Sequence, residues 1–212
     1  MKIGVLALQG AFAEHLIALR RLGVESIAVR RLEQLDDLNG LIIPGGESTT
    51  MLKLCGIFNF SDKLREISSK GFPIWGTCAG AILLAGEVGN TNPNMPIGLG
   101  LMKIAVRRNA FGRQVDSFED KIKIPALGDE PFPAVFIRAP LIESVEPPAE
   151  VLARLGNGTI VAVRQENLLA TSFHPELSLD DRFHRYFLKM AERYQAYRIA
   201  TKYLTVSRPT VS

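Results

Sequence analysis

The sequence has few cysteines, no long apolar run and no block of like charges. Only Cys55 and Cys78 occur among its 212 residues, so disulfides are not needed to hold the fold together and a reducing compartment, the cytoplasm, is expected. No run approaches the roughly 20 consecutive apolar residues that a membrane-spanning helix needs. These absences predict a cytoplasmic protein that does not associate with membranes.

Other classes of protein are excluded by missing motifs and by the charge distribution. The start, "MKIGVLALQGAFAEH", has a short apolar stretch before Gln9 and no small-residue cleavage site, so we expect a buried strand and not a signal peptide. The net charge of +3 is spread over interspersed signs, which makes nucleic acid an unexpected partner. No dinucleotide fingerprint, P-loop or paired-cysteine metal spacing occurs, so neither a cofactor nor a metal is predicted.

The first part of the chain alternates between strand and helix patterns. Short β-rich runs lie at 2–8, 25–31, 39–46 and 73–77, and helical patterns lie at 11–23, 58–71 and 79–86. Alternation of this kind predicts a mostly parallel open sheet with helices on both faces, which is a three-layer α/β fold. With 47% hydrophobic residues, the chain can bury the core of one domain.

From about Asn90 the pattern changes. Glycine and proline punctuate residues 90–100, and strand-like runs follow at 101–108, 120–127, 134–140 and 158–173. We expect these runs to form an added antiparallel or mixed portion of the sheet. Residues 182–204 predict a long amphipathic helix. Without repeats or a linker, residues 1–194 form a single domain, and 195–212 are expected to be the end of a helix and a flexible tail.

Cys78 lies at a junction between a strand and a helix. In "GTCAG" it follows the apolar run "PIWGT", precedes the helical run "AGAILLAG", and is flanked by Gly76 and Gly80. Small neighbours let the helix approach the strand while the residue at the apex takes a rare backbone conformation, as in a nucleophile elbow. The start of a helix also favours a thiolate. The alternative is a structural cysteine buried at the end of a strand.

Three histidines are available as a base for this cysteine. His15 and His184 lie in helical patterns among charged residues, so we expect them on the solvated surface. His174 follows a strand-like run and precedes Pro175, which favours extended backbone, so His174 and Glu176 should point to the same side. Glu176 can then orient His174, and His174 can take the proton of Cys78. The alternative is a loop with a surface ion pair.

A glycine-rich turn follows the strand at 39–43. In "LIIPGGEST" two glycines allow the backbone N–H groups near Gly46 to point outward, where they can hold an oxyanion together with the N–H of Ala79. Ser48 is a candidate cap for the following helix. The alternative is an ordinary turn with a helix cap.

The segments "PGGES", "GTCAG" and "FHPE", in this order, resemble those of class I, triad-type glutamine amidotransferases. More closely, "LALQGAFAEH", "PGGESTTM", "RNAFGRQVDSFE", "FIRAP" and "SFHPEL" resemble the glutaminase-subunit family of pyridoxal 5′-phosphate synthase. The similarity runs from Lys2 to about Tyr194. It implies a flavodoxin-like sheet, hydrolysis of L-glutamine to glutamate and ammonia, and transfer of the ammonia to a synthase subunit that builds the vitamin B6 ring in a large hetero-oligomer.

The resemblance also implies roles for individual residues. It makes Cys78 the nucleophile, His174 the base and Glu176 its orienting carboxylate. It places substrate contacts at six further positions, which are Gly46, Glu47, Ser48, Arg108, Ile137 and Arg138. An arginine suits the α-carboxylate of glutamine, which it can bind with two parallel hydrogen bonds. Without the resemblance, Arg108 and Arg138 would be assigned to the surface.

Two other functions fit parts of this pattern. A stand-alone cysteine-elbow hydrolase or stress protein would share the elbow but would not need "FHPE" late in the chain. A non-catalytic regulatory subunit could keep the fold as a binding surface, because a fold does not guarantee an activity. Release of glutamate from glutamine discriminates between these possibilities.

Overall fold

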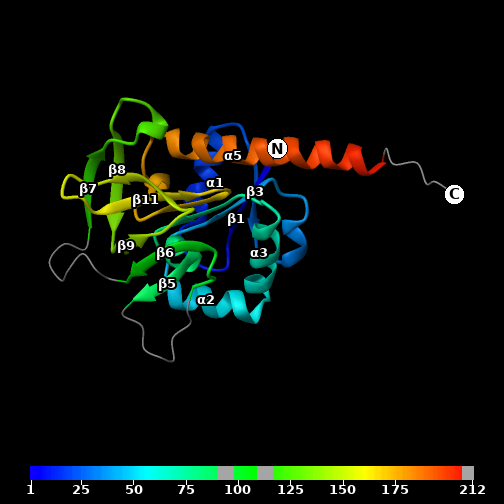
Figure 1. The fold of residues 1–212 in the computed structure, drawn as a ribbon, viewed down its shortest axis with the longest axis horizontal. Coiled ribbons are helices and arrows are strands. Elements are labelled where there is room, and N and C mark those ends of the chain that lie inside the picture. The colour runs from blue at the N-terminus through cyan, green and yellow to red at the C-terminus, as the bar shows by residue number, and fades with distance from the viewer. Residues whose placement is uncertain (90–97, 109–116, 207–212) are drawn as a thin grey trace.

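A computed structural model of the chain describes residues 1–89, 98–108 and 117–206, the last five of these as helix backbone. It shows a central sheet between two layers of helices (Figure 1). The predicted features at 90–97, most of the motif at 109–116 and the tail at 207–212 lie outside the described residues.

The strands occupy twelve segments of the described chain. They are β1 (Lys2–Leu6), β2 (Glu25–Val29), β3 (Gly40–Ile43), β4 (Ile74–Thr77), β5 (Ala85–Gly89), β6 (Met102–Arg107), β7 (Ser117–Ile122), β8 (Phe132–Ile137), β9 (Leu141–Val145), β10 (Glu150–Arg154), β11 (Ile160–Gln165) and β12 (Leu168–Thr171). The helices are α1 (Phe12–Arg21), α2 (Ser48–Ile57), α3 (Phe60–Ser69), α4 (Ala79–Leu84) and α5 (Arg182–Val206), with short 3₁₀ helices η1 (Leu32–Leu35), η2 (Pro125–Leu127) and η3 (Pro175–Leu177).

Within the described residues, ten strands form one sheet, in the order β2-β1-β3-β4-β12-β11-β9-β6-β5, with β10 paired to β11. The first five strands of this order are parallel to one another. Their order corresponds to the 2-1-3-4-5 arrangement of flavodoxin-like folds. The pairs β11–β12, β10–β11, β9–β11 and β6–β9 are antiparallel. The predicted parallel core with an added mixed portion is therefore confirmed.

Two hydrophobic cores cover the two faces of the sheet. Neighbouring residues on one strand alternate between them: Ile74 packs into the core beneath α2, α3 and α4, while Trp75 packs into the core beneath α1 and α5. This alternation follows from the two-residue period of a strand. Strands buried on both faces must be apolar throughout, which is why "GLII" and "IWGT" have no polar face.

Some boundaries differ from those predicted. The run at 120–127 is a strand only as far as Ile122 and then forms η2, because Pro125 cannot donate to a strand ladder and suits the first turn of a helix. The strands β5, β9 and β10 were not predicted. Their sequences contain glycine or charged residues, and pairing with other strands of the sheet stabilises them, β5 with β6, β9 with β6 and β11, and β10 with β11.

The junction between β4 and α4 brings backbone segments into close contact near the carboxyl edge of the sheet. A Cβ atom on Gly76 would lie 2.4 Å from the carbonyl of Gly80, and a Cβ on Gly80 would lie 2.1 Å from the carbonyl oxygen of Ile43. The helix can therefore begin directly against β3 and β4 only if both positions are glycine. This packing fixes the position of Cys78, which lies between them.

None of the helices in residues 1–89, 98–108 and 117–206 combines the length and the apolar composition that spanning a membrane requires.

The substitution Gly80→Ala tests this junction. The added methyl group meets backbone atoms of Ile43, so we expect the free energy of unfolding to fall by about 1–3 kcal/mol. Gly56→Ala is the matched control, because Gly56 lies in α2 with open space around the added Cβ, and alanine favours a helix by about 0.5–1 kcal/mol over glycine. Urea unfolding measures both. Equal stability of Gly80→Ala and the unchanged chain would contradict the close packing.

Candidate functional site

A cavity of about 540 Å³ opens at the carboxyl ends of the parallel strands. Its lining includes the turn after β3, the start of α4, His174 and the segment after β8. The complete lining is Ala11, Gly45, Gly46, Glu47, Ser48, Thr49, Cys78, Ala79, Ile82, Arg108, Ile137, Arg138 and His174. Ligands of open α/β sheets bind at this edge, because the loops that follow adjacent strands converge there. Its size suits a small-molecule ligand.

Cys78 occupies the apex between β4 and α4. Its backbone has φ 49° and ψ −105°, which is a strained conformation for a residue with a side chain. Its N–H donates to the carbonyl of Thr171 on β12 over 2.8 Å, and its side chain is nearly buried with Sγ 3.8 Å from the carbonyl oxygen of Ile137. A strained residue held from both sides is typical of a nucleophile elbow.

His174 and Glu176 follow β12, the strand next to β4. His174 Nδ1 lies 2.7 Å from Glu176 Oε1, and both side chains are buried. The backbone N–H of His174 donates to the carbonyl of Val135 over 2.8 Å, which fixes the histidine between β8 and β12. Because Glu176 accepts from Nδ1, Nε2 of the imidazole is the nitrogen left for the thiol.

The environment of His174 favours its charged form. Burial lowers the pKa of the imidazole, but hydrogen bonds with Cys78 and Glu176 outweigh burial and raise it to about 10. Burial alone would also raise the pKa of Glu176, but the imidazoles of His15 and His174 outweigh burial and keep it below its ordinary value. The anionic carboxylate of Glu176 therefore stabilises the imidazolium form of His174, which is the form that donates a proton to a leaving group.

The predicted surface positions of His15 and His184 are wrong. Both are fully buried, at 0% and 1% exposure, and their rings contact Trp75 edge to face with centroids 5.6 and 5.1 Å away. Each lies one helical turn before a buried leucine, Leu19 on α1 and Leu188 on α5. This spacing of four residues is the sequence signal for burial, but the charged neighbours of both histidines are equally compatible with a solvated helix face.

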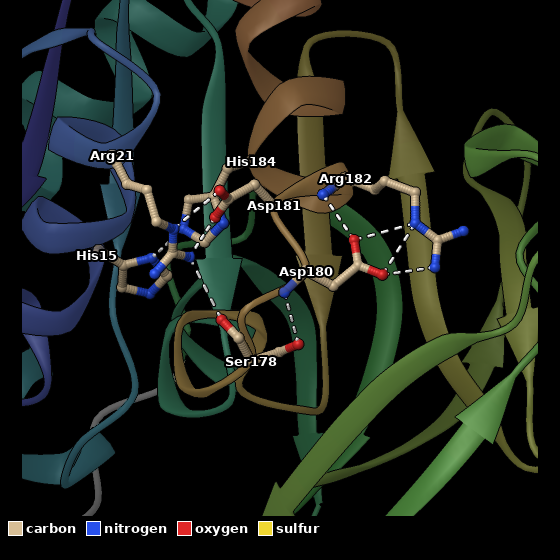
Figure 2. A network of polar contacts seen from close by, with 7 residues as sticks. All are labelled: His15, Arg21, Ser178, Asp180, Asp181, Arg182 and His184. Carbon is tan, nitrogen blue, oxygen red and sulfur yellow. Dashed lines mark hydrogen bonds and ion pairs between the residues drawn. The ribbon is translucent and has the colours of Figure 1, made fainter.

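Ion pairs brace the segment that joins the glutamate to α5. Arg21 on α1 pairs with Asp181 and donates to the carbonyl of Ser178, while Asp180 pairs with Arg182 (Figure 2). Arg182 also donates to the carbonyls of residues 130 and 131. These contacts tie residues 178–182 to α1 on one side and to the segment before β8 on the other.

The turn at 44–46 is held by the loop after β1. Ala11 N–H donates to the carbonyl of Gly45 over 2.9 Å, and Glu47 N–H donates to Gln9 Oε1 over 2.9 Å. Gly10 makes this approach possible, because it has φ 99° and its Cβ would lie 2.0 Å from the Gly45 oxygen. Sequence reasoning missed Gln9 and Ala11 as parts of the site, although both lie in "LALQGAF", which carries part of the resemblance.

Glu47, and not Ser48, caps α2. Its carboxylate accepts from the N–H groups of Thr49 and Thr50 over 2.9 and 2.7 Å. Burial opposes ionisation, but these hydrogen bonds and the Thr50 hydroxyl outweigh it and lower the pKa of Glu47 to about 2. The serine was expected to cap because its side chain suits that position, but the longer carboxylate reaches both free donors from one residue earlier. Ser48 is buried at the cavity wall.

The remaining predicted residues lie on the far wall. Arg108 is buried, which contradicts the alternative of a surface arginine, and its Nη1 donates to Thr49 Oγ1 over 3.0 Å. Burial lowers its pKa, and the charge of Glu47 acts in the opposite direction. Ile137 and Arg138 are both exposed, and Arg138 has φ 46°. All nine predicted residues other than Glu176 thus line one cavity, and Glu176 lies behind His174.

In the part of the chain that the structure describes, no group of three or more histidine, cysteine, aspartate or glutamate side chains has the arrangement of a metal site.

A comparison with known protein families matches most of the chain to a single family. Residues 5–193 match the SNO glutamine amidotransferase family. Among curated proteins, the "Pyridoxal 5′-phosphate synthase subunit PdxT" of Dehalococcoides mccartyi is 60% identical over 197 residues, which is 92% of this chain and 100% of that protein. The protein of the same name from Moorella thermoacetica is 58% identical over 191 residues, covering 90% and 99% of the two chains.

Solved structures agree with the fold. A structure described as a glutamine amidotransferase superposes with a TM-score of 0.84 at 50% identity and covers 90% of this chain and 98% of its own. A putative GMP synthase protein from Thermoplasma acidophilum superposes with a TM-score of 0.69 at 19% identity, covering 93% and 97% of the two chains. At that identity the second likeness shows the fold alone.

The two thiols are expected to react very differently with a diazoketone analogue of glutamine. Cys78 lines the cavity, whereas Cys55 is fully buried and burial raises its pKa to about 12, so only Cys78 should form the thioether. Peptide mapping by mass spectrometry identifies the labelled residue. Cys55→Ala should retain labelling and glutamine turnover, whereas Cys78→Ala should lose both. A label on Cys55 would contradict the assignment.

Proposed function

The chain belongs to the SNO glutamine amidotransferase family, and we propose that Cys78, His174 and Glu176 are the triad with which it hydrolyses L-glutamine. Identity of 60% to curated subunits of pyridoxal 5′-phosphate synthase makes it the glutaminase that supplies ammonia for vitamin B6 synthesis. The observation that carries the triad is the hydrogen bond of 2.7 Å between His174 and Glu176 directly behind Cys78.

The reaction is an acyl transfer in two steps. His174, whose surroundings favour its charged form, holds the proton of the Cys78 thiol while the sulfur attacks the side-chain amide carbon of glutamine. The tetrahedral oxyanion is held by the N–H of Ala79 and by the turn at Gly46. His174 then gives its proton to the departing ammonia, which leaves a glutamyl thioester. A water molecule, activated by the same imidazole, hydrolyses the thioester and releases glutamate.

The cavity offers complementary charges for the amino-acid end of glutamine. Arg108, whose guanidinium is close enough to Glu47 for their charges to interact, is our candidate for the α-carboxylate. Backbone and side-chain groups of Gly46, Glu47, Ser48, Ile137 and Arg138 line the remaining wall. We assign these five residues to substrate binding, with Glu47 as the partner of the α-ammonium group because its low pKa keeps it anionic.

The product ammonia needs an acceptor outside this chain. We infer that the chain works in a hetero-oligomer with the synthase subunit of pyridoxal 5′-phosphate synthase, because its relatives are named as subunits of that enzyme. The loop at 6–12 and helix α2 are our candidates for the contact. α2 and the residue after it present the exposed side chains of Ile57 and Phe58, and apolar groups of this kind favour a protein interface. A reactive thiol suits the reducing cytoplasm.

Glutamate release also separates this function from a non-catalytic role on the same fold. A regulatory subunit would not need a buried carboxylate aligned with an imidazole next to a strained cysteine, because burying a charge costs free energy. The stand-alone hydrolase or stress protein is disfavoured by the family match over residues 5–193.

Substitution of the triad separates orientation from proton transfer. Glu176→Gln should lower kcat by roughly 10²–10⁴-fold while glutamine binding persists, because the imidazole loses the carboxylate that orients it. His174→Ala should lose more, since Cys78 then has no proton acceptor. Single-turnover measurement of thioester formation, with circular dichroism as a control for folding, tests both. A kinetically silent Glu176→Gln would reduce the triad to a dyad.

The isolated chain should be a poor glutaminase that becomes active when it binds the synthase. The orientation of the Gly45–Gly46 peptide is set by Ala11 of the loop after β1, so a partner that docks on this loop can shift the turn between two states. A shift of about 1.4 kcal/mol changes the ratio of the states tenfold. The rate of glutamate release should therefore rise and saturate as synthase is added.

Cys78→Ala mixed with the synthase is the control for glutaminase activity contributed by the partner preparation. A full rate from the isolated chain, unchanged by added synthase, would contradict both the two-state turn and the role as a subunit.

A further inference from the structure

The two oxygens of Glu176 have different surroundings. Oε1 accepts the short hydrogen bond from His174, whereas Oε2 is buried and no full hydrogen bond reaches it within the described residues. The polar group beside Oε2 is His15 Nε2, at 3.3 Å. A buried carboxylate oxygen without a donor is costly, so the nature of this contact matters for the position of the whole carboxylate.

We propose that His15 is a positioning residue for the triad, and that it directs its Nε2–H toward Glu176 Oε2 while His184 fixes this tautomer. This inference rests on the proposed glutaminase function. His15 comes from α1 and His184 from α5, and their side chains meet (Figure 2), with His15 Nδ1 3.1 Å from His184 Nε2.

Counting donors and acceptors selects the tautomer. If His184 carries its proton on Nε2, it donates to His15 Nδ1, and His15 then carries its proton on Nε2, between Thr77 Oγ1 at 3.3 Å and Glu176 Oε2. The buried Nδ1 of His184, which has no hydrogen-bond partner in the described part of the chain, is then a bare acceptor.

The opposite arrangement is worse at two places. With its proton on Nδ1, His15 would donate to His184, and the buried Nδ1–H of His184 would be a donor without a partner in the described residues. The lone pair of His15 Nε2 would also face the carboxylate oxygen of Glu176. An unsatisfied donor and an acceptor facing an anion both cost free energy.

Both histidines are neutral in this arrangement. Burial lowers the pKa of His15, and it lowers the pKa of His184 to about 3, assisted by His15. A neutral donor to Oε2 adds no cation beside His174, so the charge of Glu176 remains available to the imidazolium form of His174. The Nε2–H groups of His184 and His15 then point toward the carboxylate from one side, and the Nδ1–H of His174 points toward it from the other.

A pair of substitutions of similar shape tests the donor. The side-chain nitrogen of glutamine can take the place of Nε2, whereas methionine fills a similar volume without a donor. In the presence of the synthase subunit, His15→Met should lower kcat by about 10–100-fold, the range for a hydrogen bond to a charged group. His15→Gln should retain most of kcat. KM for glutamine should stay unchanged in both, because His15 does not line the cavity.

Equal losses of kcat in His15→Gln and His15→Met would overturn the proposal, because packing alone would then explain both losses. Full activity of His15→Met would also overturn it. His184→Met should lower kcat less than His15→Met and should add little when the two substitutions are combined, because His184 acts through His15. Additive losses would contradict this order.

A measurement on the unaltered chain does not depend on the variants folding. The chain has three histidines, so ¹⁵N-histidine labelling gives three pairs of ring-nitrogen shifts, assigned with the His15→Gln and His184→Met variants or, if these do not fold, by through-space contacts in the native chain. We expect His15 and His184 to be neutral with the proton on Nε2. His15 protonated on Nδ1 would overturn the inference. A chain without glutaminase activity would refute the proposed function, whereas the tautomers would still be measured.

Discussion

The hydrogen bond between His174 and Glu176 is the interaction around which the site is organised. A carboxylate that is 7% exposed is stable only where donors compensate the loss of water. His174 supplies one such donor at 2.7 Å, and the fold places the imidazole of His15 on the other side of the carboxylate. The polar side chains beneath the cavity, including two histidines on different helices, are arranged to meet this one buried charge.

The sheet determines where that charge lies. Residues of the site follow β1, β3, β4 and β12, which are neighbouring parallel strands, so their carboxyl ends deliver Gln9, Gly46, Cys78 and His174 to one edge. Close packing then restricts the variation at this edge: α4 begins against β3 with no room for a side chain at Gly80. Cys78 is held rigidly because the core beneath it is closely packed.

The turn after β3 is constrained differently. Gly45 packs closely against His174 and Cys78, and two hydrogen bonds from the β1–α1 loop set the orientation of the turn. A rigid Cys78 beside a turn that is held by a neighbouring loop gives the molecule one part that must not move and one part that a docked protein could influence. This division fits the proposed glutaminase, whose ammonia would be used by a second subunit.

The sequence alone determined the parallel core, the elbow at Cys78 and the partnership of His174 with Glu176. These depend on local patterns: apolar runs of strand length, glycines around a cysteine, and a proline that fixes the spacing of two side chains. Only the tertiary structure decided that His15 and His184 are buried, because charged neighbours in the chain conceal which face of a helix meets the sheet. It also decided that Glu47 caps α2 and that Gln9 holds the turn, since these contacts depend on distances between atoms that sequence spacing does not fix.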